Sequence, residues 1–326
     1  MAVLKTVLVT GATGGLGYSV ANYLEKNGFN VVSTGRTLKS FQIFSKFIEC
    51  DLAEMSIFDM VIKFGEIDYV IHCAALATDN DSTADYHKYN VDVTEKLINY
   101  ANTIHLNKFV YISSPSMYYS GVDRHLVTED DIIYHDKVSL YAASKIKSEQ
   151  LFSKADHRFN TVILRPRAIF GEHDTVLFPK IIKMLTKKKS IFPRAAKIKQ
   201  DFTYVENVSH AVYCSLMNDV EDCSIFNITN HEPAYLEDIL NTIIKHKQLN
   251  STIIDMPTII PKIVNMLDKI AYYFKLNKYL PFTSHAINSI STDMTLSNEK
   301  AIKILKYKPI FSMQDGLIKT LNKGLN

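Results

Sequence analysis

Tyr141 and Lys145, four positions apart, are the residues of this sequence whose types and spacing best suit proton transfer. Residues at positions i and i+4 share one face of a helix. A cation beside a phenol lowers the pKa of the phenol, which brings its hydroxyl closer to use as a proton donor or acceptor. The pair therefore predicts an acid/base site in which Tyr141 transfers the proton.

Two serines, Ser113 and Ser114, stand upstream of this pair, at the end of an apolar run that starts at Phe109. Such a run is typical of a buried strand in a parallel sheet, and ligands of these sheets bind at the carboxyl ends of the strands. A hydroxyl at that edge can hydrogen-bond the oxygen that gains or loses charge during hydride transfer. The predicted catalytic set is therefore Tyr141 and Lys145 together with one of these two serines, Ser113 or Ser114.

A glycine-rich segment, residues 10–17, lies between a first apolar run at 3–10 and a helical pattern at 16–27. Its spacing is G-x-x-G-x-x-G. In a strand–turn–helix context, glycines permit a tight turn and let a pyrophosphate approach the backbone N–H groups at the helix start. The residues predicted to bind a cofactor here are Gly11, Thr13, Gly14, Gly15, Leu16 and Gly17.

The end of the second expected strand favours one form of this cofactor. A carboxylate there would bind the ribose 2′-hydroxyl of NAD, but the strand ends with Ser33, Thr34, Gly35 and Arg36. Arg36 offers a cation to a 2′-phosphate, and Ser33, Thr34 and Thr37 offer hydroxyls. The sequence therefore favours NADP, with NAD as the alternative.

The elements that must position these residues alternate along the first half of the chain. Short β-branched runs are separated by helical patterns such as residues 91–104, which predicts parallel β-α-β units and a doubly wound α/β sheet, the Rossmann fold. We assign residues 1–165 to an NAD(P)-binding domain. The expected strands are 3–10, 29–34, 46–50, 69–73, 109–113 and 161–164.

In the second half of the sequence, helical and strand patterns no longer alternate regularly. A helix at 176–186 and strands at 202–205 and 224–229 predict a smaller mixed α/β substrate cap, residues 166–326, with segments near 200–230 returning to the Rossmann sheet. The apolar pattern within 257–282 is open to three interpretations: a core helix, a lid, or a membrane-surface helix.

Composition narrows the class of protein. The chain has 326 residues and a formal net charge of +3, too even a balance for a nucleic-acid binder or a polybasic anchor. The four cysteines show no C-x-x-C spacing, and His72 has no partner at ligand spacing, so we expect neither a disulfide framework nor a metal site. No apolar run is long enough to span a membrane, and we expect a cytoplasmic protein.

Together these motifs resemble the extended short-chain dehydrogenases/reductases, the NAD(P)-dependent epimerase/dehydratase superfamily. That superfamily includes nucleotide-sugar epimerases and 3β-hydroxysteroid dehydrogenases, and the resemblance extends over nearly the whole chain. The matching segments are residues 10–17, 50–52, 70–75, 90–91, 110–114, 141–145 and 164–166.

The resemblance implies roles for individual residues. Tyr141 would be the acid/base, Lys145 would hold the nicotinamide ribose and lower the pKa of Tyr141, and Ser114 would orient the substrate oxygen. A homodimer through the helices near 91–104 and 141–153 is also implied. The further cofactor contacts that it implies are Asp51, Leu52, Ala74, Ala75 and Pro166.

Later segments favour one branch of the superfamily. Residues 165–171, 201–208, 226–233 and 280–283 resemble the 3β-hydroxysteroid dehydrogenase-like branch, which includes bacterial reductases of long-chain β-keto acids. Ala168 stands where sugar-nucleotide enzymes usually carry an asparagine, which argues against a nucleotide sugar.

We therefore hypothesise an NADP(H)-dependent oxidoreductase that interconverts a ketone and a secondary alcohol on an apolar small molecule. One alternative is a nucleotide-sugar epimerase with tightly bound NAD, and another is a non-catalytic NADP(H) sensor. The intact set of Ser114, Tyr141 and Lys145 weighs against a sensor, which has no chemical need for all three. The identity of the substrate depends on residues after Pro166.

Overall fold

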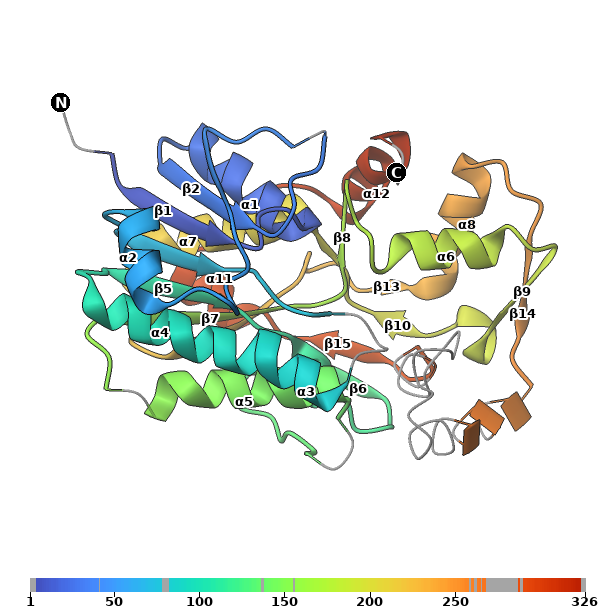
Figure 1. Ribbon diagram of the computed structural model, residues 1–326. Coiled ribbons are helices and arrows are strands. Elements are labelled where there is room, and N and C mark those ends of the chain that lie inside the picture. The colour runs from blue at the N-terminus through green and yellow to red at the C-terminus, as the bar shows by residue number, and fades with distance from the viewer. Residues whose placement is uncertain are drawn as a thin grey trace.

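A central sheet of seven parallel strands forms the core of the molecule (Figure 1). The computed structural model describes residues 4–323 except 41, 78–81, 136–137, 155, 258, 261–262, 265, 268–286 and 288–289. The strand order is β12-β7-β5-β4-β1-β2-β3, which confirms the predicted doubly wound fold. The strands are β1 (Thr6–Thr10), β2 (Asn30–Gly35), β3 (Lys46–Glu49), β4 (Tyr69–His72), β5 (Lys108–Ile112), β7 (Asn160–Pro166) and β12 (Ser224–Ile228).

The strand order reverses at β1, which pairs with β2 on one side and with β4 on the other. Ligands of open α/β sheets bind at such a switch point, outside the carboxyl ends of the strands. At this point the turn that follows Thr10 faces Cys73 and Ala74, the residues that follow β4. Gly11 and Ala74 therefore meet where a cofactor is expected.

Alternate strand residues bury two apolar layers. Val7 and Val9 pack beneath α1, α7 and α11, whereas Leu8 packs beneath α2, α4 and α5, since successive side chains of a strand point to opposite faces. Figure 1 shows α4 and α5 side by side on one side of the sheet. The helices are α1 (Gly15–Lys26), α2 (Ile57–Phe64), α4 (Val93–Thr103), α5 (Leu140–Lys154), α7 (Val205–Met217) and α11 (Glu299–Leu305).

The remaining elements surround the carboxyl edge of the sheet. In Figure 1, α6, α8, β9 and β14 lie together to the right of the central sheet. A third apolar cluster joins α6, α8 and α12. The short strands pair as β13-β10-β15-β6, β11-β8 and β14-β9. The helices are α3 (Thr83–Tyr86), α6 (Phe178–Leu185), α8 (Leu236–His246) and α12 (Met313–Lys323), with η1 (His87–Asp92), η2 (Pro115–Tyr118) and η3 (Pro193–Ala196). The strands are β6 (Arg124–Val127), β8 (Ile169–Phe170), β9 (Lys189–Phe192), β10 (Lys199–Gln200), β11 (Thr203–Tyr204), β13 (Ala234–Tyr235), β14 (Thr252–Asp255) and β15 (Met294–Leu296).

Two features of the second half bear on the predicted domains. β12 pairs with β7 and extends the central sheet, and α11 and Tyr307 also pack into its core.

The first part of the expected helix 91–104 is instead the end of a π-helix, η1, which α4 continues. Most of the segment 257–282 lies outside the described residues. Among the described helices, none is both long and apolar enough to cross a membrane.

Candidate active site

A cavity of about 810 Å³ runs from the glycine-rich turn to the predicted catalytic residues and on into the second half of the chain. Its walls come from the ends of β5 and β7, from α5, and from α6 and neighbouring loops. The glycine-rich turn and the predicted catalytic residues therefore line the same cavity. Of the predicted site residues, those that line it are Gly15, Leu16, Ala75, Ser114, Tyr141, Lys145 and Pro166.

Lys145 is buried on α5 beneath the end of β5. Its Nζ atom donates hydrogen bonds to the carbonyl oxygen of Ile112 at 2.8 Å and to the hydroxyl of Tyr111 at 3.2 Å. Nζ also lies 4.7 Å from the centroid of the Tyr111 ring, a cation–π contact. Burial lowers the pKa of Lys145 to about 8, although attraction to Cys73 and Glu149 opposes this shift. The side chain therefore still carries its charge at neutral pH.

Tyr141 lies one helical turn before Lys145 and borders the cavity. Burial raises the pKa of the Tyr141 phenol to about 12, and only a hydrogen bond with Ser114 lowers it. Desolvation dominates this shift, while Nζ of Lys145 is bound to Tyr111 and Ile112. The expectation that Lys145 lowers the pKa of Tyr141 stays a prediction.

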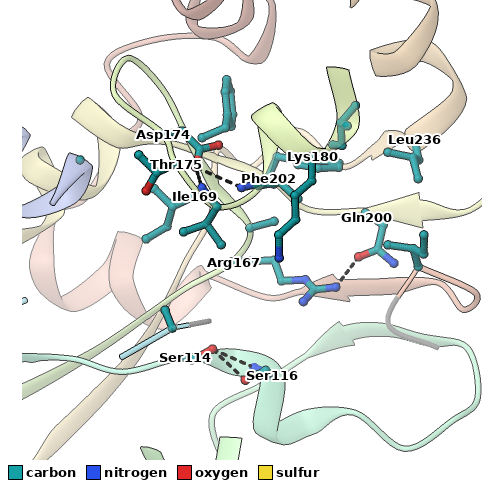
Figure 2. Close-up of a pocket in the computed structure, with 18 of the residues that line it drawn as sticks. Ser114, Ser116, Arg167, Ile169, Asp174, Thr175, Lys180, Gln200, Phe202 and Leu236 are labelled. Atoms are coloured by element: carbon teal, nitrogen blue, oxygen red, sulfur yellow. Dashed lines mark hydrogen bonds between the residues drawn. The ribbon is translucent and has the colours of Figure 1, made fainter. Parts of the chain in front are cut away.

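Ser114 stands at the N-cap of η2, directly after β5 and Ser113. Its Oγ lies 2.9 Å from the Oγ of Ser116 and accepts a hydrogen bond from the Ser116 amide (Figure 2). Ser114 also forms a hydrogen bond with Tyr141, so the hydroxyls of Ser114 and Tyr141 lie together at the cavity wall. Such a pair can hydrogen-bond a carbonyl or alcohol oxygen.

A buried ion pair supports this wall from behind. Glu149, one turn after Lys145 on α5, accepts hydrogen bonds from the Nε and Nη2 atoms of Arg165 on β7. It also accepts one from Ser113 Oγ, and Arg165 Nη1 donates to the hydroxyl of Tyr118. Sequence patterns gave no sign of this network, because its members come from distant segments.

The glycine-rich turn has the shape that a pyrophosphate requires. A β-carbon on Gly17 would lie 2.2 Å from the carbonyl oxygen of Gly11, and one on Gly11 would lie 2.7 Å from Cα of Ala74. Gly11 also has φ +65°, a conformation that favours glycine. Gly14, the N-cap residue of α1, has no side chain that could cap the first amides of the helix. The first turn also contains no acidic residue. The helix start therefore fits an anionic group.

The residues near the end of β2 only partly match the predicted 2′-phosphate site. Arg36 and Thr37 are exposed, and the guanidinium carbon of Arg36 lies 5.5 Å from the centroid of the Tyr89 ring. Ser33 and Thr34 are fully buried, and the Thr34 hydroxyl donates to the carbonyl oxygen of Ile48. The expectation that the hydroxyls of Ser33 and Thr34 bind the 2′-phosphate is wrong, because both side chains are buried on β2 between β1 and β3.

The other implied cofactor contacts, Asp51, Leu52 and Ala74, are not among the residues that line the cavity. Asp51 Oδ1 accepts a hydrogen bond from the Ala53 amide, and the Leu52 side chain packs in the core. A contact between Leu52 and adenine would therefore have to use its backbone. The Ala74 amide donates to the Thr10 hydroxyl, which holds the turn after β4 against the glycine-rich turn.

His72 and the cluster of His157, Asp222 and Cys223 carry side chains of the types that bind metals. His72 is buried between the hydroxyls of Thr10 and Thr94, and burial lowers its pKa to about 3, so it is neutral. His157, Asp222 and Cys223 lie close together, but each imidazole nitrogen of His157 already faces a backbone carbonyl. Burial also raises the pKa of the Cys223 thiol to about 11, which disfavours a thiolate ligand.

The far end of the cavity holds side chains that sequence motifs did not single out as ligands. Arg167, Lys180 and Gln200 project into it among apolar side chains such as Ile169 and Phe202 (Figure 2). Arg167 directly follows β7, so the sheet register carries it to the edge beside Ser114. The predicted lining residue Phe282 lies outside the described residues.

Comparison with known proteins identifies relatives with this architecture. The model of the "NAD dependent epimerase/dehydratase family" matches residues 7–229. The uncharacterized protein YbjS of Escherichia coli is 29% identical, over 96% of each chain. The sterol-4-alpha-carboxylate 3-dehydrogenase, decarboxylating, of Dictyostelium discoideum is 26% identical, over 96% of this chain and 99% of its own. Among solved structures, the Bacillus cereus UDP-glucuronic acid 4-epimerase in complex with NAD has a TM-score of 0.75 and 22% identity over 98% of both chains.

Proposed function

Because this chain belongs to the NAD-dependent epimerase/dehydratase family, we propose that it is an NADP(H)-dependent oxidoreductase that interconverts a ketone and a secondary alcohol. The proposed substrate is apolar, either steroid-like or β-keto acid-like. The main support is the cavity that joins Ser114, Tyr141 and Lys145 to the glycine-rich turn and continues between apolar walls. The sterol dehydrogenases among the relatives agree with an apolar substrate.

In this proposal, a bound nicotinamide supplies or accepts the hydride. The backbone amides at the start of α1 hold the pyrophosphate, and Lys145 holds the nicotinamide ribose. Ser114 hydrogen-bonds the substrate oxygen, and Tyr141 gives that oxygen its proton during reduction. The raised pKa of Tyr141, about 12, keeps the phenol protonated at neutral pH, which is the form that reduction consumes.

The preference for NADP depends on Arg36, an exposed cation at the end of β2 with no carboxylate in the strand-end segment 33–37. A charge-assisted hydrogen bond contributes about 1.5–3 kcal/mol, so Arg36→Ala should raise the Kd for NADP about tenfold or more. The Kd for NAD should stay within threefold. Equal affinity for NAD and NADP in the wild type, unchanged in the variant, would contradict the assignment.

The reaction itself is tested by incubating the protein with NADPH and either a 3-ketosteroid or a long-chain 3-oxo acid. Loss of absorbance at about 340 nm, general to reduced nicotinamide, together with formation of the alcohol supports an oxidoreductase. Isomerised UDP-sugar without net loss of NADPH would identify an epimerase instead. Activity that survives Lys145→Ala at wild-type level would contradict the assigned role of this residue, whereas its loss in a folded variant excludes a pure sensor.

We also propose a homodimer through α4 and α5, the helices at one side of the central sheet. Size-exclusion chromatography with light scattering should give a mass near twice 37.1 kDa. A monomer at working concentration would contradict this arrangement.

A further inference from the structure

The guanidinium of Arg167 has no task in the chemistry proposed above, yet the backbone holds it firmly at the cavity. The Arg167 amide donates to the carbonyl oxygen of Ile228 at 3.1 Å, and its own carbonyl oxygen accepts from the Thr203 hydroxyl at 2.6 Å. The residue is thus tied to the segments of β12 and β11. These two bonds fix the backbone of Arg167, and the hydrogen bond of Nη2 to Gln200 orients the guanidinium before any ligand arrives.

The described residues use little of the hydrogen-bonding capacity of this guanidinium. Within the described part of the chain, Arg167 Nη2 donates to Oε1 of Gln200, while Nε is buried and has no hydrogen-bond partner. Gln200 is itself fixed, because its Nε2 donates to the carbonyl oxygen of Thr292 at 2.7 Å. An arginine has five N–H donors, and leaving one buried without an acceptor is costly. The arrangement therefore leaves a place for an acceptor.

The charge of Arg167 is not neutralised by a direct ion pair with any residue that the structure describes. Among the described residues, no carboxylate oxygen lies within 4.0 Å of the Arg167 guanidinium, although Asp201 attracts it from farther away. The Asp201 carboxylate accepts a hydrogen bond from the Leu296 amide. Burial lowers the pKa of Arg167 to about 10, opposed by Asp201, so the group keeps its charge at neutral pH.

Glu172 and Asp174, the two acidic residues of the described cavity wall, have partners other than Arg167. Glu172 accepts a hydrogen bond from the Tyr204 hydroxyl at 2.6 Å, and Asp174 accepts hydrogen bonds from amides at the start of α6. A second cation, Lys180 of α6, points toward Arg167 (Figure 2). The wall near Arg167 thus presents positive charge to an interior that is otherwise apolar.

We propose that Arg167 binds an anionic oxygen group, a carboxylate or a phosphate ester, at one end of an otherwise apolar substrate, and so selects which substrates the enzyme accepts. Guanidinium groups bind both anions through charge-assisted hydrogen bonds. The apolar walls formed by Ile169, Phe202 and Leu236 would hold the rest of the molecule. The inference rests on the proposed function for the reaction, but its anion site can be tested without turnover.

The binding test uses the protein with saturating NADP and three probes of equal chain length: dodecanoate, dodecyl phosphate and dodecanol. Calorimetry should show that the wild type binds at least one of the anions about tenfold or more tighter than dodecanol. Arg167→Gln should reduce this preference to threefold or less, and Arg167→Lys should retain part of it. Arg158→Gln, the same change at an exposed arginine away from the cavity, should leave it intact.

The two anionic probes distinguish a carboxylate from a phosphate ester, since the tighter one identifies the group. No preference for either anion in the wild type, or a preference that survives Arg167→Gln, would overturn the inference. If Arg167→Gln unfolds, Lys180→Gln, a change at an exposed side chain of α6, should still lower the preference at least threefold, and an unchanged preference would count against the site. Arg167-dependent anion binding without reduction of any ketone would refute the proposed function and leave the anion site standing.

Discussion

Removing the charge of Glu149 should destabilise the fold strongly. Only 9% of the Glu149 side chain and 3% of the Arg165 side chain are exposed, so their ion pair is buried. Glu149→Gln preserves the shape but leaves the Arg165 guanidinium without its counter-ion. Breaking a buried pair from one side costs about 3–5 kcal/mol, a large part of the roughly 5–15 kcal/mol that stabilises a typical domain.

The free energy of unfolding can be measured by urea titration followed by far-ultraviolet circular dichroism, because the chain has no tryptophan for fluorescence. Asp123→Asn is the matched control. It breaks a pair with Arg194 in which both side chains are nearly half exposed, and should cost at most about 1 kcal/mol. A Glu149→Gln cost as small as that of the control would refute the reasoning. Replacing Glu149 and Arg165 together by apolar residues should cost less than Glu149→Gln alone.

Three further outcomes follow from the site. The kcat/KM for ketone reduction should fall as pH rises through about 8, because burial gives Lys145 a pKa of about 8 and its charge is lost above it; a flat profile to pH 10 would contradict this role. Glu149→Gln should move that limb to lower pH, measured in the same assay, because Glu149 raises the pKa of Lys145. Gly17→Ala should abolish NADP binding in calorimetry, because its β-carbon would lie 2.2 Å from the carbonyl oxygen of Gly11. Gly28→Ala is the control, because a β-carbon there would meet nothing within 4 Å. It should cost only about 1 kcal/mol of stability, for its positive φ, and leave NADP binding unchanged.

Local patterns predicted the fold correctly and proposed the main site residues, for a physical reason. The glycine turn, the β-branched runs and the Tyr141–Lys145 spacing each depend on neighbours within a few residues. The register of a parallel sheet then brings the carboxyl ends of the strands to one edge. The position of Ser114 just after β5 was therefore enough to predict that it lies near this edge. These features can be derived without knowing how distant segments pack.

Features that depend on distant packing could not be derived in the same way. Arg165 and Glu149 pair across β7 and α5. Arg167, which follows β7, meets Gln200 of β10, a strand of another sheet. The burial of Ser33 follows from the position of β2 between β1 and β3, which a single strand does not reveal. The direction of Lys145 toward Tyr111 likewise depends on how α5 packs under β5.

The most direct test of the central claim is the effect of Tyr141→Phe on ketone reduction by NADPH. The substitution removes the hydroxyl but keeps the ring that packs beside Tyr86. General acid catalysis contributes about 10²–10⁴-fold, so kcat/KM should fall by that factor while the Kd for NADPH stays within threefold. A folded Tyr141→Phe protein that reduces the same ketone at the wild-type rate would contradict the account.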